Sequence, residues 1–267
     1  MITLIDLTQT IGPLQGDSAA LHGEVSRLVR EVGLRAPGPT ASGPRDAWCA
    51  SHGIALEHVP DAVGFELDVI RRLGLAWGTR IDAPLHSAAA RDDRPLPSMA
   101  DMAMPALLCD GMVLDLREAC RPGEAISINA LQAAIDAVGR DICPGDAVLL
   151  RTGQERFTTE DPEYANHPGM TREGTLFLTM RGVHVVGTDA LAWDRPFPVL
   201  HRLYEETGDP SQLWDGHLAI REREAFIVQQ LRNLGALPPT GFKVAFFPLK
   251  VAGASASPCR AVALLIE

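Results

Sequence analysis

Short runs of apolar residues, separated by turn-forming residues, recur along the second half of the chain. Runs of about four to eight such residues, bounded by Gly, Pro, Asp or Asn, are typical of buried β-strands. A similar short run opens the sequence. The pattern predicts strands over residues 2–5, 112–116, 147–150, 183–189, 244–247 and 260–266, and a strand or an extended edge over residues 222–231.

Helical spacing is less frequent along the chain. Apolar residues recur every three or four positions in residues 19–34 and again in residues 129–138, which predicts two amphipathic helices. Residues 35–45 are rich in Pro, Gly and Ser and are expected to form a loop. Because the predicted strands outnumber the helices, the pattern favours an α/β fold with a mixed sheet.

The regularity of the pattern changes near residue 65. Residues 65–267 carry the regular runs and are expected to form the core, whereas residues 10–64 are interpreted as a divergent insertion or lid. Trp48, in that insertion, is a candidate to cover a substrate pocket. With 267 residues and 46% hydrophobic content, the chain can bury one large core, so we expect a single domain over residues 1–267.

The net charge limits which kinds of molecule the protein is expected to bind, and the cysteines indicate the redox state of its thiols. A net charge of −10 argues against nucleic acid and against anionic membrane surfaces, and favours a small-molecule substrate. The five cysteines show no clustered ligand spacing, so they are expected to be reduced thiols. Asp6 interrupts the apolar start, and no window approaches the ~18 apolar residues of a membrane helix, so a cytoplasmic location is expected.

The most informative segment is residues 76–86, Ala-Trp-Gly-Thr-Arg-Ile-Asp-Ala-Pro-Leu-His. It resembles the His-x-Gly-Thr-His-x-Asp-x-Pro-x-His motif of the cyclase family, which includes bacterial kynurenine formamidases, isatin hydrolases and trans-dienelactone hydrolases. Further segments match that family in the same order, namely residues 111–116, 144–153, 187–189, 233–238 and 247–250.

The resemblance implies a swivelling β/β/α fold and assembly into homodimers or homotetramers. It also implies zinc or manganese bound to the first two His and the Asp of the motif, with a later His and Glu completing a second site in two-metal members. In this chain Ala76 and Arg80 replace the two His. Asp82 is retained, His217 stands at the later His, and Gln229 replaces the Glu.

These replacements change the expected chemistry. A catalytic zinc needs about three protein ligands, and a permanently protonated guanidinium repels cations, so we predict that no metal is bound tightly. If residues 76–82 are extended, Ala76, Gly78, Arg80 and Asp82 share one face of the strand. Arg80 is then expected to pair with Asp82, in the place where the family holds its cation.

The sequence therefore predicts an enzyme of the cyclase family that works without a metal. His86 matches the family's catalytic His and is expected to act as general base or acid, with Asp82 and Arg80 completing the catalytic group. The expected substrate is a small cyclic or carbonyl-bearing metabolite, aromatic compounds included, contacted by Trp77, His217, Gln229 and Trp48. Proton-transfer reactions such as cyclisation, ring opening or dehydration are easier to support than attack by unactivated water.

Each assignment has a simpler alternative. His86 can serve as a structural hydrogen-bonding residue, Arg80 as an ordinary ion-pair partner, and Trp77 as part of the core. Asp189 is interpreted as a structural carboxylate rather than a catalytic one. For the whole protein, the alternatives are a noncatalytic binding or assembly protein, and a metal-dependent amide or lactone hydrolase that uses altered ligands.

Overall fold

The computed structural model describes residues 1–10, 78–158 and 161–266, which belong to one compact unit. The strands are β1 (Ile2–Asp6), β2 (Arg80–Asp82), β3 (Ala90–Arg91), β4 (Arg94–Pro95), β5 (Leu108–Asp115), β6 (Ala147–Arg151), β7 (Val185–Thr188), β8 (Phe226–Gln229), β9 (Phe242–Pro248) and β10 (Ala256–Ile266).

Helices and short 3₁₀ turns connect these strands. The α-helices are α3 (Met104–Leu107), α4 (Ile128–Val138), α5 (Pro162–Ala165), α6 (Arg172–Thr179), α7 (Phe197–Thr207) and α8 (Asp215–Leu218). The 3₁₀ turns are η4 (Pro84–His86), η5 (Met99–Asp101), η6 (Gln154–Arg156), η7 (Pro210–Gln212), η8 (Ala219–Arg221) and η9 (Leu234–Ala236). No helix in the described ranges is long and apolar enough to cross a membrane.

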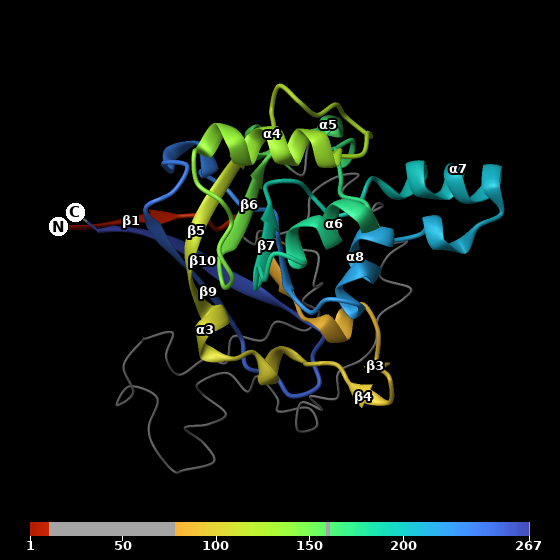
Figure 1. Cartoon of the computed structure of the whole chain (residues 1–267), viewed down its shortest axis with the longest axis horizontal. Coiled ribbons are helices and arrows are strands. Elements are labelled where there is room, and N and C mark those ends of the chain that lie inside the picture. The colour runs from red at the N-terminus through yellow and green to blue at the C-terminus, as the bar shows by residue number, and fades with distance from the viewer. Residues whose placement is uncertain (11–77, 159–160, 267) are drawn as a thin grey trace, which may run out of the picture. The chain divides into compact units, whose positions relative to one another are not determined.

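The main sheet closes on itself (Figure 1). Its strand order is β1-β10-β2-β8-β7-β6-β5-β9, and an additional pairing of β9 with β10 joins the two sides. Seven strands thus form a closed, barrel-like mixed sheet, with β1 added outside on β10. Strands β5, β6, β7 and β8 pair in parallel with one another, and the other pairings are antiparallel. This architecture confirms the expected mixed α/β fold.

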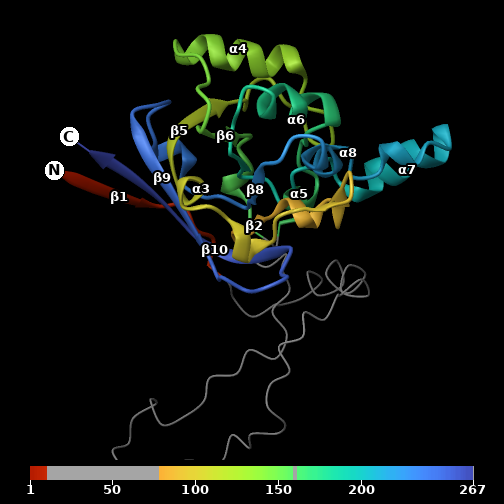
Figure 2. The same ribbon diagram turned by 60° about the horizontal axis from the view of Figure 1, so that its bottom comes forward.

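Alternation along the central strands produces two cores. On β6, Leu149 packs in the cluster shared with β9 and β10, whereas Val148 and Leu150 pack in the cluster that contacts the helices. Successive side chains of a strand point to opposite faces, so one sheet separates the two clusters. Figure 2 shows α4 and α6 together on one side of β5 and β6. The candidate site lies on this helix-covered face.

Several elements agree closely with the sequence prediction. The helix predicted at residues 129–138 is α4, in which Ser127 accepts a hydrogen bond from the Ala130 amide and Gly139 ends the helix at φ 73°. These are the usual cap residues for the two ends of a helix. The strands predicted near residues 112, 147, 183, 244 and 260 correspond to β5, β6, β7, β9 and β10.

Three expectations require correction. The strand expected over residues 222–231 is confined to β8, which lies inside the sheet between β2 and β7 rather than at an edge. Gly78 has φ 69°, so the extended segment begins only at Arg80. Helices α6 and α7 were not predicted, because polar residues and Thr dilute the apolar spacing of α6 and Pro lies at the start of α7. The predicted insertion at residues 10–64 falls, from residue 11 onward, on residues that the structure does not describe. The same holds for Trp77.

Candidate functional site

The site forms where β2 pairs with β8. Arg80 lies directly opposite Gln229, and Asp82 lies opposite Ile227. Ile227 packs in the helix-side core, whereas Ile81 packs in the other core. Arg80, Asp82 and Gln229 therefore project from the helix-covered face, as the alternation of a strand requires.

Arg80 occupies the centre of this group. Its Nη2 donates to Gln229 Oε1 at 2.8 Å, and its Nη1 donates to the Leu191 carbonyl oxygen at 3.3 Å. Its Nε lies 3.7 Å from Asp82 Oδ1, and the side chain is only 12% exposed. The structure thus contains the Arg80–Asp82 ion pair that the sequence predicts. The guanidinium is held on three sides and does not extend into solvent.

Asp82 is the buried anion of the site. Gln229 Nε2 donates to its Oδ2, and His217 Nε2 lies 3.3 Å from the same oxygen. Burial raises the pKa of the Asp82 carboxyl, but His86, which is protonated at the acidic pH where Asp82 titrates, the charge of Arg80 and the hydrogen bond from His217 outweigh this and hold the pKa below its usual range. Asp82 is therefore ionised at neutral pH.

His217, on α8, bridges two carboxylates. Its ring Nδ1 contacts Asp194 Oδ2, and its backbone amide donates to Asp194 Oδ1 at 3.1 Å. Burial alone lowers the pKa of His217, but the charge and hydrogen bond of Asp194, together with Asp82, raise it to about 9. His217 is thus a cation at neutral pH, and two cations balance two anions in the cluster Arg80, His217, Asp82 and Asp194.

The sequence did not identify Asp194. It lies in a loop after β7, and no local spacing relates it to a histidine 23 positions later. Gly216 makes its approach possible, since a Cβ there would lie 2.7 Å from Asp194 Oδ1. A small residue before a candidate histidine is too common a pattern to have predicted this contact.

His86 ends η4 and lies beside the ion cluster. Its ring centroid is 6.0 Å from that of His217, and the residue is exposed to solvent. Asp82 raises the pKa of His86, but desolvation and the cationic His217 and Arg80 together lower it below its usual value. His86 is thus neutral at pH 7. Its Nδ1 lies 3.1 Å from the Oγ of Ser255, a second residue that the sequence did not identify.

Asp189 has the structural role that the sequence favoured. It is fully buried, and its carboxylate accepts from the Thr152 amide at 2.8 Å, the Thr152 hydroxyl at 2.7 Å and the Gly153 amide at 2.8 Å. These bonds fix the turn after β6. Burial raises the pKa of Asp189, although the bonds from Thr152 and Glu155 oppose this.

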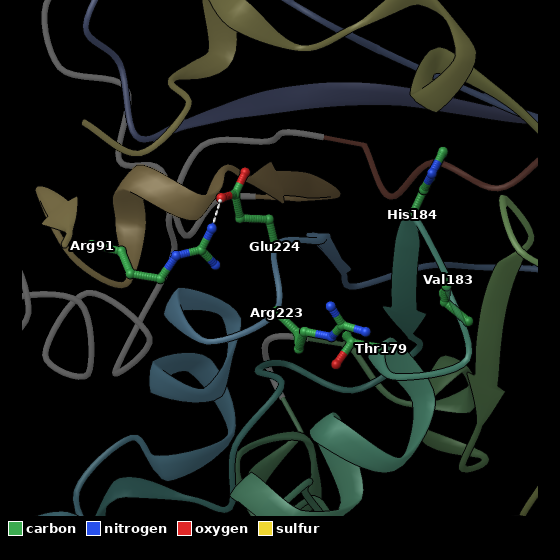
Figure 3. Close-up of a pocket in the computed structure, with 7 residues that line it drawn as sticks. Arg91, Thr179, Val183, His184, Arg223 and Glu224 are labelled. Carbon is green, nitrogen blue, oxygen red and sulfur yellow. Dashed lines mark hydrogen bonds and ion pairs between the residues drawn. The ribbon is translucent and has the colours of Figure 1, made fainter. Parts of the chain in front are cut away.

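Two of the predicted substrate-binding residues, Trp48 and Trp77, lie outside the described residues. The other two, His217 and Gln229, are brought together with Arg80, Asp82 and His86. A cavity of about 310 Å³ lies elsewhere, beside His184 at the start of β7, and Figure 3 shows Arg91 directed at Glu224 there. None of the residues that line this cavity belongs to the ion cluster around Asp82. The cavity is therefore separate from the candidate site.

The donor atoms around Asp82 do not fit a divalent cation. Asp82 and His217 supply two family ligand positions, but Gln229 Oε1, at the third position, already accepts from Arg80 and from the Trp193 amide. The guanidinium 3.7 Å from Asp82 repels a metal. Within the described ranges, no group of three or more His, Cys, Asp or Glu side chains is arranged to hold a metal ion.

Comparison with known proteins agrees with the fold and with the family resemblance. The kynurenine formamidase of Sphingopyxis alaskensis is 26% identical over 212 residues, which is 79% of this chain and 85% of that protein. Isatin hydrolase A from Labrenzia aggregata, bound to benzyl benzoate, has a TM-score of 0.70 and 20% identity, covering 100% of this chain and 94% of that one.

A second solved structure agrees with these relatives. Isatin hydrolase A from Ralstonia solanacearum has a TM-score of 0.67 and 27% identity, covering 99% of this chain and 92% of that one. A family model described as "Putative cyclase" matches residues 5–195. Because that match covers well over half of the sequence, the chain belongs to the cyclase family.

Proposed function

We propose that this protein is a metal-independent enzyme of the cyclase family, which acts on a small carbonyl-bearing metabolite by acid–base catalysis. The observation that carries the proposal is the guanidinium of Arg80, bound to Gln229 and paired with Asp82. The permanently charged guanidinium of Arg80 lies against the Asp82 carboxylate, at the position where the family resemblance expects a metal ion. The positive charge that the family resemblance assigns to a metal is thus supplied by the protein itself.

His86 is the proposed proton-transfer residue. It is exposed to solvent, and its lowered pKa leaves the ring neutral and able to accept a proton at pH 7. The cationic His217 lies beside it. A cationic donor beside the base would stabilise a negatively charged oxygen in the transition state, a contribution of typically ~10²–10³ in rate.

The relatives indicate which substrates to test first. One is named a kynurenine formamidase and two are isatin hydrolases, so isatin and the formamide of kynurenine are the first candidates. The net charge of −10 disfavours a strongly anionic substrate in general, which also points to small neutral or zwitterionic compounds.

The experiment is turnover of these compounds by the purified protein, measured with and without a chelator and accompanied by elemental analysis. We expect equal rates in both conditions, and a loss of ~10²–10³ in kcat/KM for Arg80→Ala. Arg202→Ala is the matched control, because Arg202 is an exposed arginine on α7. Activity that appears only with added zinc or manganese would overturn the proposal, and so would full activity in His86→Ala.

A further inference from the structure

A serine hydroxyl faces the imidazole of His86. Ser255 Oγ lies 3.1 Å from His86 Nδ1, which is hydrogen-bond distance. The backbone fixes this approach, because the Ala83 amide donates to the Ser255 carbonyl at 2.8 Å and Ala256 lies directly opposite Asp82. The pair is thus attached to the same strand junction that holds the ion cluster.

The other serines of the described ranges have structural partners. Ser87 donates to the Pro84 carbonyl, Ser98 and Ser211 donate to the carboxylates of Asp101 and Asp209, Ser127 caps α4, and Ser257 donates to the Pro258 carbonyl. Ser255 differs, because within the described part of the chain its hydroxyl contacts an imidazole rather than a carbonyl, amide or carboxylate. A hydroxyl within hydrogen-bond reach of a base is the arrangement that activates a serine nucleophile.

The surroundings of the pair suit acyl transfer. Ser255 is partly exposed and His86 is exposed, so both side chains are accessible from solvent. His217, a cation held by Asp194, lies with its ring centroid 6.0 Å from that of His86. A nucleophile and a base therefore lie beside the buried ion cluster.

We propose that Ser255 is the nucleophile of this site and that it forms a covalent acyl-enzyme from an amide or lactone carbonyl. This inference rests on the proposed function, and it specifies how a hydrolysis proceeds there without metal-activated water. The Ser255 oxygen forms a bond to the carbonyl carbon, and its proton passes to His86 Nδ1. The carbonyl π electrons move to the carbonyl oxygen.

The remaining steps use the same groups. The tetrahedral intermediate collapses, the bond to the leaving nitrogen or oxygen breaks, and the proton on His86 passes to that leaving group. Water then attacks the acyl-enzyme, gives its proton to His86, and releases the acid as the Ser255 hydroxyl is restored. The net reaction adds one water molecule across the amide or lactone bond and needs no further co-reactant.

The test is covalent labelling of the full-length protein with a fluorophosphonate, followed by intact-mass and peptide mass spectrometry. The serine oxygen displaces fluoride, so one phosphonyl group per chain is expected on Ser255. Ser255→Ala is expected to abolish this adduct, and His86→Ala to slow its formation by about 10²–10⁴. Ser211→Ala, a change of an exposed serine, is expected to label at the normal rate.

A parallel measurement traps the substrate itself. Acid quenching during turnover of isatin or formylated kynurenine is expected to yield an acyl adduct on the peptide that contains Ser255. The proposal of a serine nucleophile is overturned if neither the fluorophosphonate nor the substrate modifies Ser255. It is also overturned if Ser255→Ala turns over substrate at the normal rate. In that event, loss of activity in His86→Ala and Arg80→Ala would still support the proposed function, so the two failures are distinguishable.

Discussion

Arg80 Nη2 and Gln229 Oε1 are joined by a hydrogen bond of 2.8 Å between directly opposed residues of β2 and β8. The same oxygen accepts from the Trp193 amide at 3.0 Å, and the amide nitrogen of Gln229 donates to Asp82. The side-chain amide is therefore fixed in one orientation by three partners. A carboxylate at position 229 would place a second negative charge against Asp82.

Gln229→Glu is the first prediction. Two buried carboxylates in contact raise one of their pKa values, so we expect a loss of about 1–3 kcal/mol in stability at pH 8 that shrinks as the pH is lowered to 5. Urea denaturation at the two pH values measures the loss. Gln132→Glu, on the exposed side of α4, is the control and is expected to change stability only slightly. Unchanged stability at pH 8 would contradict the account of Gln229.

Arg80→Met tests the buried cation. The substitution keeps much of the side-chain volume but leaves Asp82 without its guanidinium, and removing one partner of a buried pair costs about 3–5 kcal/mol. Chemical denaturation of the variant gives the loss directly. Because the exposed Arg202 pairs with Glu206 in solvent, Arg202→Met is expected to cost less than about 1 kcal/mol. Equal effects of the two changes would show that Arg80 is an ordinary surface residue.

His217 and Asp82 give the folded state a pH dependence. The pKa of His217 is raised to about 9, so its contribution to stability is complete below the unfolded pKa of 6.5 and is lost as the pH rises through 9. The pKa of Asp82 is lowered, so its contribution is present above 3.8 and is lost as the pH falls below that value.

From these two groups, stability is expected to be highest between about pH 4 and pH 6.5 and to decline on the alkaline side. Thermal denaturation from pH 5 to 10 measures the decline, and His217→Gln is expected to flatten it. His201, exposed on α7, provides the control, since His201→Gln is expected to leave the profile as it is. A wild-type profile that is flat between pH 6.5 and 9 would exclude a buried imidazolium at position 217.

Gly216→Ala tests the packing around Asp194. The new Cβ would lie 2.7 Å from Asp194 Oδ1 and 3.0 Å from the Met170 carbonyl oxygen, so backbone has to move. We expect a loss of about 1–3 kcal/mol in the free energy of unfolding and a shift of the His217 ring signals in NMR. In Gly174→Ala the nearest atom is the flexible end of Met170 at 3.0 Å, so this helical control is expected to cost little or to stabilise. Similar losses in both variants would argue against a specific role for Gly216.

The sequence predicted those parts of the fold and of the candidate site that depend on local residue patterns. Short apolar runs located most of the strands, period-two spacing placed Arg80 and Asp82 on one face, and helical spacing located α4. The family resemblance located His217 and Gln229. Asp194 and Ser255 could not be predicted, because each reaches its histidine through a loop whose path is set by tertiary packing. Helix α7 was missed for a related reason, since half of its length carries polar residues and it projects away from the strands (Figure 1).

The threefold pairing of β10 has a consequence for the order of synthesis. This strand pairs with β1, β2 and β9, and the residue before it contacts His86. Among the elements described, β10 is the last to leave the ribosome. Residues 1–248 therefore emerge before the sheet has its closing strand, and the unpaired edges of β2 and β9 are open to incorrect association during translation.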